Sequence, residues 1–189
     1  MMKRYPYILL LIVTLAFTAC SKEQKDVNNK TKKHENVEIK VQKTDKITLT
    51  TVDNKKIEVK KTKKGFLFSN AKDKIVLVSF FATWCPPCKA EIPHLNNLQE
   101  KYKDKLKIIG ILIESSKDND ELKSFMNYHA INYTVTNSPS NQTLANAVGG
   151  VKNIPFMIMY DKKGDYVTHY LGAIPEEMID SDIQTALKK

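Results

Sequence analysis

The pattern of apolar and polar positions beyond residue 46 predicts strands that alternate with helices. A continuous apolar run rich in β-branched residues at 75–81 is typical of a buried central strand, and residues 107–113 are predicted to be a second buried strand. Shorter strands are predicted at residues 47–51, 57–61, 66–68, 133–136, 156–160 and 166–171. Helices are predicted at residues 87–102, 118–128, 142–148 and 175–187. This alternation predicts an α/β fold with a central sheet that has helices on both faces, preceded by an N-terminal β-hairpin.

The first twenty residues have the layout of a bacterial export signal. Lys3 and Arg4 precede an apolar run at 7–17, which is too short to span a bilayer comfortably. The sequence Phe-Thr-Ala-Cys at 17–20 resembles a lipobox, after which cleavage leaves a lipid-modified cysteine. We therefore expect a signal peptide at 1–19 and a lipidated Cys20, which would anchor the chain on the extracytoplasmic, periplasmic side of the cell envelope. An ordinary signal peptide and an uncleaved anchor are the alternatives.

The net charge of +9 is concentrated near the N-terminus. Residues 22–64 contain 14 lysines and 7 acidic residues, whereas residues 65–189 contain 14 of each. Arg4 is the only arginine, so the arginine contacts that usually read nucleic-acid bases are missing and no nucleic-acid partner is expected. Residues 20–46 are predicted to be a polar, lysine-rich tether to a membrane, and residues 47–189 a single folded domain.

The candidate chemistry is a pair of cysteines, Cys85 and Cys88, separated by Pro86 and Pro87. The pair follows a predicted buried strand and opens a predicted helix, whose N-terminus favours ionisation of a thiol to the nucleophilic thiolate. Cys85 at the helix tip is expected to attack, and Cys88 one turn later to resolve the mixed disulfide. A zinc site would need four ligands, and a two-residue loop makes a weak structural disulfide. No metal or organic cofactor is required.

Glu91 is a candidate for proton transfer because of its place on the predicted helix. At 100° per residue it falls within the apolar stripe, one turn from Cys88. An inward-facing carboxyl group should have a raised pKa and could exchange protons with the Cys88 sulfur. The alternative is a glutamate that reaches solvent or pairs with a lysine.

The segment at 75–93, IVLVSFFATWCPPCKAEIP, resembles the thioredoxin superfamily, and more narrowly the TlpA/ResA-type membrane-tethered, extracytoplasmic thiol–disulfide oxidoreductases. The resemblance covers about residues 47–189 and includes Ile154 and Pro155. It implies a thioredoxin-like fold with a mixed sheet, in which Pro155 is cis and faces the dithiol. Ile154 and Pro155 would then present backbone to a substrate, with Trp84, Pro86 and Pro87 around them.

This resemblance implies a thiol–disulfide oxidoreductase that reduces disulfides in exported proteins and exchanges electrons with a membrane donor or acceptor. Cytochrome c maturation is one candidate process, although Phe156 replaces the polar or acidic residue that often follows the proline in that branch. A disulfide-donating oxidase of the same fold and a Cu(I)-binding metallochaperone are the alternatives. Trp84 is expected to pack as well as to cap the dithiol, and His94 and His129 are expected at the surface.

Overall fold

The structure is a computed structural model, and it describes residues 46–115 and 117–188. The predicted signal peptide, Cys20 and nearly all of the tether lie outside these described residues. Within them, no helix combines the length and the apolar composition that spanning a membrane requires.

The described chain contains eight strands and four helices in the order that the hydrophobic pattern predicts, with bounds that differ from the prediction by at most two residues. The strands are β1 Lys46–Thr50, β2 Lys56–Lys61, β3 Phe66–Phe68, β4 Ile75–Phe81, β5 Leu106–Leu112, β6 Thr134–Thr136, β7 Phe156–Tyr160 and β8 Tyr166–Leu171. The helices are α1 Pro86–Lys101, α2 Asn119–Tyr128, α3 Ser140–Ala147 and α4 Glu176–Leu187.

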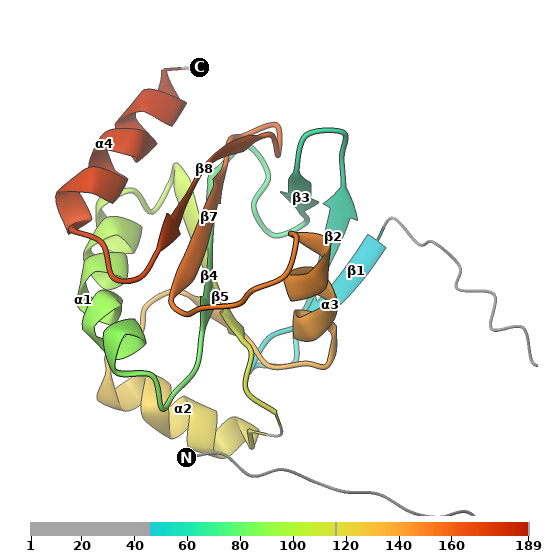
Figure 1. Ribbon diagram of the computed structural model, residues 1–189, viewed down its shortest axis with the longest axis vertical. Coiled ribbons are helices and arrows are strands. Elements are labelled where there is room, and N and C mark those ends of the chain that lie inside the picture. Colours follow the sequence, from blue (N-terminus) through green and yellow to red (C-terminus); the bar gives the residue numbers. More distant parts are fainter. Residues whose placement is uncertain (1–45, 116, 189) are drawn as a thin grey trace, which may run out of the picture. The chain divides into compact units, whose positions relative to one another are not determined.

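The larger sheet has five strands in the order β6-β5-β4-β7-β8 (Figure 1). Strands β4, β5 and β6 run parallel, whereas β7 is antiparallel to β4 and β8 is antiparallel to β7. The sheet is therefore mixed. Helices α1, α2 and α4 pack on one face, and α3 together with the strands β1–β3 packs on the other. The predicted fold class, a thioredoxin-like central mixed sheet with helices on both faces, is confirmed.

The N-terminal extension is larger than the predicted hairpin. Strands β1, β2 and β3 form a separate three-stranded antiparallel sheet, because β3 also forms hydrogen bonds with β2. Phe66 and Phe68 of β3 are buried against the ring of Tyr160 in β7. The short strand is thus held by aromatic packing onto the larger sheet, which its three residues alone did not indicate.

Strand β4 lies at the centre of the larger sheet, and all seven of its residues are buried. Its neighbours β5 and β7 satisfy the backbone hydrogen bonds on both sides, since a buried strand has no water to bond with. Each of its large apolar side chains contributes about 1.5–3 kcal/mol through burial. The strand ends at Phe81, so this well-packed core fixes the starting point of the loop that leads into α1.

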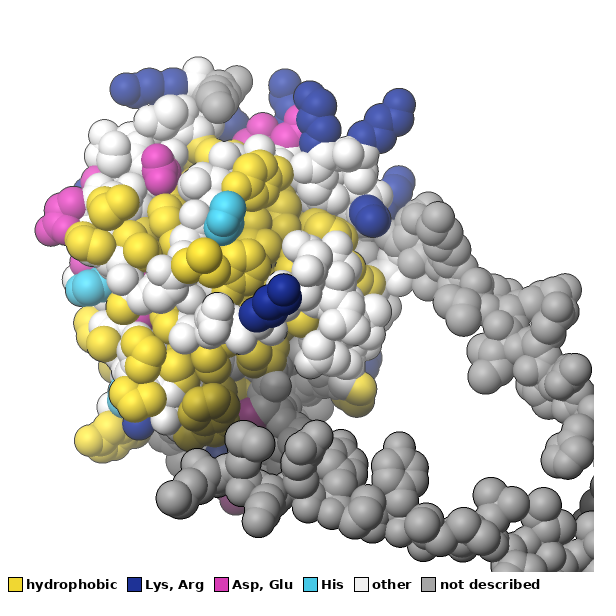
Figure 2. Space-filling model, viewed as in Figure 1, with side chains coloured by type: hydrophobic (Ala, Val, Ile, Leu, Met, Phe, Trp, Pro, Cys, Tyr) yellow, Lys and Arg dark blue, Asp and Glu magenta, His cyan; other side chains and the backbone are white. Residues whose placement is uncertain are grey.

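The outer strand β8 is covered less completely. Hydrophobic side chains gather on the face of the molecule over β7 and β8 in the view of Figure 2. Tyr166 and Leu171 of β8 are among the exposed large hydrophobic residues, and a cavity of about 400 Å³ lies beside Phe156 and His169. The dense core therefore lies under β4, β5 and β7, which are the strands that carry the candidate site.

Candidate functional site

The two cysteines lie where β4 has ended and α1 begins. Cys85 is the N-cap residue of α1, with Pro86 and Pro87 in its first turn. Its Sγ accepts a hydrogen bond from the backbone N–H of Cys88, at 3.3 Å. The two residues form a disulfide with their Cα atoms 5.3 Å apart, and both are buried. The structure thus shows the oxidised form, and it places Cys85 where the positive end of the helix favours a thiolate after reduction.

A cis peptide bond joins Ile154 and Pro155 next to the disulfide. The Sγ of Cys85 lies 3.9 Å from the carbonyl oxygen of Ile154. Pro155 is buried, and its own carbonyl accepts a hydrogen bond from the N–H of Gly172 after β8. The cis geometry and the position beside the dithiol agree with what the resemblance implied for this proline.

Trp84 does not pack into the protein. It is 68% exposed, so the expectation that it packs is wrong, and its ring lies at the surface directly before Cys85. Pro86 and Pro87 are also exposed. Cys85, which follows Trp84, caps the helix and forms the buried disulfide, whereas the side chain of Trp84 lies outside the core. It forms part of the surface around the dithiol.

Glu91 is the buried carboxyl group of α1. It is 1% exposed, which rules out the alternative of a glutamate that reaches solvent or pairs with a surface lysine. Its Oε2 accepts a hydrogen bond of 3.0 Å from the backbone N–H of Ile174, while Oε1 has no partner. Burial raises the pKa of Glu91, and the Ile174 N–H and the charge of His94 oppose that increase. The predicted inward direction and the direction of the pKa shift are therefore confirmed.

His94 and His129 are half-buried, so each reaches the surface but is covered more than the sequence indicated. His129 follows α2, and its ring packs against the ring of Phe125. His94 lies on α1 one turn after Glu91, and its Nδ1 is buried without a hydrogen-bond partner. The pattern along α1 did not indicate the burial of His94. The side chain is covered by residues 173–175, the segment before α4, which lies beside α1.

A contact that the sequence did not reveal holds the loop before the dithiol. The carboxylate of Glu114 accepts hydrogen bonds of 2.9 Å from both the backbone N–H and the hydroxyl of Thr83. Glu114 follows β5 as Thr83 follows β4, so the two lie together at the carboxyl ends of neighbouring parallel strands. The signal available in the sequence was that Thr83 and Glu114 each come shortly after a predicted buried strand.

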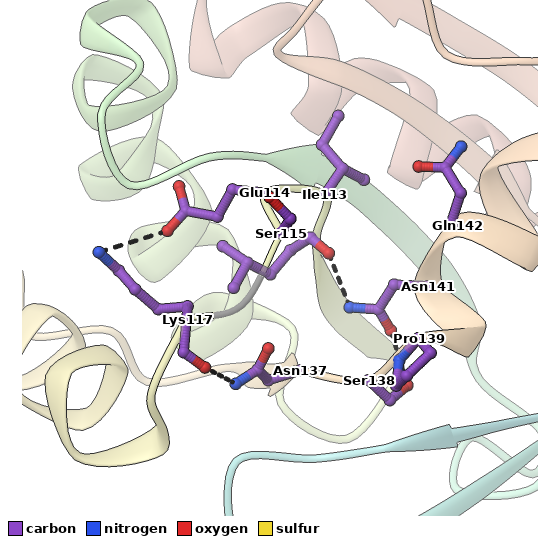
Figure 3. Close-up of a pocket in the computed structure, with 10 residues that line it drawn as sticks. Ile113, Glu114, Ser115, Lys117, Asn137, Ser138, Pro139, Asn141 and Gln142 are labelled. Atoms are coloured by element: carbon purple, nitrogen blue, oxygen red, sulfur yellow. Dashed lines mark hydrogen bonds and ion pairs between the residues drawn. The ribbon is translucent and has the colours of Figure 1, made fainter.

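Glu114 also lines a cavity of about 620 Å³ between the end of β5 and the start of α3 (Figure 3). Lys117 forms an ion pair with Glu114 at 3.4 Å, and Asn141 donates to the carbonyl of Leu112 at 2.8 Å. These contacts give the side chains of Glu114, Lys117 and Asn141 partners within the chain. Among the residues that the structure describes, no three His, Cys, Asp or Glu side chains are grouped so that they could hold a metal ion.

A helix-terminal pair of sulfurs beside a cis-proline, on a mixed sheet of this order, places the chain among the thioredoxin-type thiol–disulfide oxidoreductases. Within that class the chain belongs to the Redoxin family, which matches residues 42–187. The TlpA/ResA-type resemblance stated from the sequence is confirmed by relatives named thiol-disulfide oxidoreductase ResA.

Three relatives illustrate this membership. The thiol-disulfide oxidoreductase ResA of Bacillus thuringiensis (strain Al Hakam) is 29% identical over 133 residues, which are 70% of this chain and 69% of that protein. Thioredoxin C-2 of Corynebacterium nephridii is 31% identical over 104 residues, which are 55% of this chain and 71% of that protein. The crystal structure of a thiol:disulfide interchange protein of the thioredoxin family from Chlorobium tepidum TLS has a TM-score of 0.58 and 26% identity, and the match covers 75% of this chain and 93% of that chain.

The buried carboxyl of Glu91 predicts a pH-dependent loss of stability. Because folding raises its pKa above the ordinary value of 4.5, the folded chain binds the carboxyl proton more tightly than the unfolded chain. The free energy of unfolding should therefore fall as the pH rises from 4.5 through the folded pKa. Glu91→Gln should remove this fall and make the oxidised protein more stable than wild type at pH 8, but not at pH 4. Urea unfolding at the two pH values measures the difference.

Glu100→Gln is the matched control for this measurement, because Glu100 lies exposed on the same helix. Its stability difference from wild type should be small at both pH values. A Glu91→Gln variant that is less stable than wild type at pH 8 would contradict the account of Glu91 as a buried carboxyl with a raised pKa.

Proposed function

We propose that the protein is a membrane-tethered oxidoreductase that reduces disulfides in exported proteins. The observation that carries the proposal is the Cys85–Cys88 disulfide at the N-terminus of α1, with the Ile154 carbonyl 3.9 Å from the Cys85 sulfur. A pair in this position can be reduced by one partner and can then reduce the disulfide of another. The relatives named thiol–disulfide oxidoreductases and thioredoxin support this class of activity.

In the proposed reaction the reduced Cys85 acts first. Its thiolate attacks one sulfur of a substrate disulfide, a new bond forms between Cys85 and that sulfur, and the second substrate sulfur leaves as a thiolate. The N-terminus of α1 stabilises the Cys85 thiolate, because its unpaired N–H groups carry a partial positive charge. The Cys88 N–H, which lies 3.3 Å from this sulfur in the oxidised form, is one of those groups.

Cys88 then resolves the mixed disulfide. Its thiol loses a proton, its sulfur bonds to the Cys85 sulfur, and the substrate leaves with both electrons as a second thiolate. Glu91 is the proposed acceptor for the Cys88 proton, since it lies one turn further along the buried face of α1. Its raised pKa makes it a stronger base than an exposed carboxylate once it is ionised.

The surface around Cys85 is the proposed docking site. The carbonyl of Ile154 lies next to the sulfur, and the exposed Trp84, Pro86 and Pro87 form the adjoining rim. An extended segment of a substrate protein can pair with backbone of this kind without a specific side-chain sequence. A site of this type accepts several exported proteins.

The proposed location rests on the N-terminal sequence. A signal peptide at 1–19, a lipidated Cys20 and a lysine-rich tether would hold the folded domain on the extracytoplasmic side of a bacterial membrane. A membrane electron donor would then reduce the Cys85–Cys88 disulfide after each turnover. The oxidase and Cu(I)-carrier alternatives are not favoured, since the relatives carry the names of oxidoreductases and a thioredoxin.

Substitution of either cysteine separates the two proposed roles. Cys88→Ser should accumulate mixed disulfides between Cys85 and exported proteins, because the resolving thiol is missing. Non-reducing electrophoresis followed by mass spectrometry identifies the species. Cys85→Ser is the matched control and should accumulate none. Trapping through Cys88 in that control would reverse the assigned roles.

The reduction potential of the Cys85–Cys88 pair tests the direction of electron flow. We expect a value near or below about −250 mV, similar to the −270 mV or so of thioredoxin, because a reductant must give up its electrons readily. Equilibration of a soluble fragment beginning at Val37 in thiol redox buffers gives this value, with the fluorescence of the neighbouring Trp84 as the readout. A potential near about −120 mV would mean a disulfide donor and would overturn the reductase assignment.

Substitution of Cys20 tests the anchor. Cys20→Ala should move the protein from the membrane fraction to the soluble fraction, since no lipid can then be attached. Immunodetection after fractionation measures the distribution, and Cys88→Ser is the matched cysteine control that should stay with the membrane. Retention of Cys20→Ala in the membrane would favour an uncleaved anchor over a lipoprotein.

A further inference from the structure

A proton that Glu91 accepts from Cys88 has to reach water, and Glu91 is itself closed off from water. Its side chain is 1% exposed. Its Oε2 is occupied by the N–H of Ile174, a backbone donor that does not release its proton at neutral pH, and its Oε1 has no partner. The proton therefore needs a neighbouring side chain that can take it up and pass it on.

His94 is placed to do this. It lies three residues after Glu91 on α1, and residues at this spacing are neighbours on a helix, with Cβ atoms about 5–6 Å apart. The Nδ1 of His94 is buried and has no hydrogen-bond partner. Two unpartnered buried atoms, the Oε1 of Glu91 and the Nδ1 of His94, thus belong to adjacent positions on one helix. Imidazole also accepts and releases protons near neutral pH.

The other side of His94 borders a cavity. This cavity has a volume of about 480 Å³ and is lined by Ala90 and His94 of α1, by residues 173–175 before α4, and by Glu176 and Glu177 in the first turn of α4. Ile174, which bonds to Glu91, is one of the lining residues. His94 is half-buried: its Nδ1 is buried, and its side chain also lines this cavity.

The remaining ionisable groups around Glu91 and His94 do not offer the same route. Tyr133 faces Glu91 from the start of β6, but burial, together with the charge of Glu91, raises its pKa above its usual range, so it does not ionise at neutral pH. Glu176 and Glu177 line the cavity from the first turn of α4 and are more exposed than Glu91. They border the cavity and form no hydrogen bond with Glu91.

We infer that His94 transfers protons between the buried carboxyl of Glu91 and the cavity before α4. This inference rests on the proposed role of Glu91. The proton moves from the Cys88 thiol to Glu91 as the Cys88 sulfur bonds to Cys85 and the substrate thiolate leaves. Because Oε1 of Glu91 and Nδ1 of His94 are not hydrogen-bonded to each other, the proton passes between them through a bridging water, and the Nε2 proton of the same ring passes to water in the cavity. His94 acts through Glu91 and is a positioning residue for the reaction.

A two-phase reaction separates this step from the attack by Cys85. The reduced full-length chain, carrying Cys20→Ala so that only the active pair reacts, is mixed with dithiobis(nitrobenzoate). The first release of nitrothiobenzoate reports the attack of Cys85 and depends on reagent concentration. The second release reports the attack of Cys88 on the mixed disulfide and is independent of that concentration. Both are followed by absorbance in a stopped-flow instrument.

His94→Gln should slow the second phase about tenfold at neutral pH and leave the first phase unchanged, since positioned proton transfer typically contributes at least this much. The pH profile of the second phase should also differ from that of the wild-type protein, because a proton-transfer group has been removed. Added imidazole should restore the second phase of His94→Ala, because the shortened side chain enlarges the cavity. An unchanged first phase shows that the variants are folded.

His129→Gln is the matched control, because His129 is also half-buried but follows α2. It should change neither phase. A second phase of wild-type rate and pH profile in His94→Gln, or an equal slowing of both phases, overturns the inference. Glu91→Gln separates the two proposals: if it slows the second phase while His94→Gln does not, only the His94 route fails. If neither variant slows it, the proposed role of Glu91 fails as well.

Discussion

The burial of β4 is the constraint on which the rest of the structure depends. Its seven residues are buried, so every backbone N–H and C=O must find a partner in β5 or β7. That requirement fixes the register of three strands at once. The carboxyl end of β4, the segment after β5 and the start of β7 then meet at one edge of the sheet. The dithiol, Glu114 and Pro155 come from these three places.

The loop between β4 and the dithiol is short, and it is held from several directions. Glu114 accepts two hydrogen bonds from Thr83, and Cys88 donates its N–H to the Cys85 sulfur. Charge-assisted hydrogen bonds of the first kind are stronger than neutral ones, which suits a loop that has to keep its geometry during reduction and oxidation. The sulfur of Cys85 therefore stays in place beside the Ile154 carbonyl.

Local sequence patterns were sufficient for the elements and for part of the site. Strand β4 is uniformly apolar, and the direction of Glu91 follows from the periodicity of α1, so both were predictable. Other features depend on residues far apart in the sequence. The exposure of Trp84 and the pairing of Thr83 with Glu114 follow from how the strand ends meet. The half-burial of His94 requires the packing of the segment before α4, which no pattern within α1 contains.

The two sulfurs lie in different environments because a buried carboxyl group, Glu91, is close to Cys88 in the sequence of α1. An apolar residue in its place would avoid the desolvation of a carboxylate, which the single N–H of Ile174 offsets only in part. In return for this desolvation cost, an ionisable group lies one turn from Cys88. The partial positive charge at the N-terminus of α1 lies beside Cys85. Cys85 is thus favoured as a thiolate in the reduced protein, whereas Cys88 needs a base at the moment of attack. In the proposed reaction, this difference in environment is the reason for assigning the first step to Cys85 and the second to Cys88.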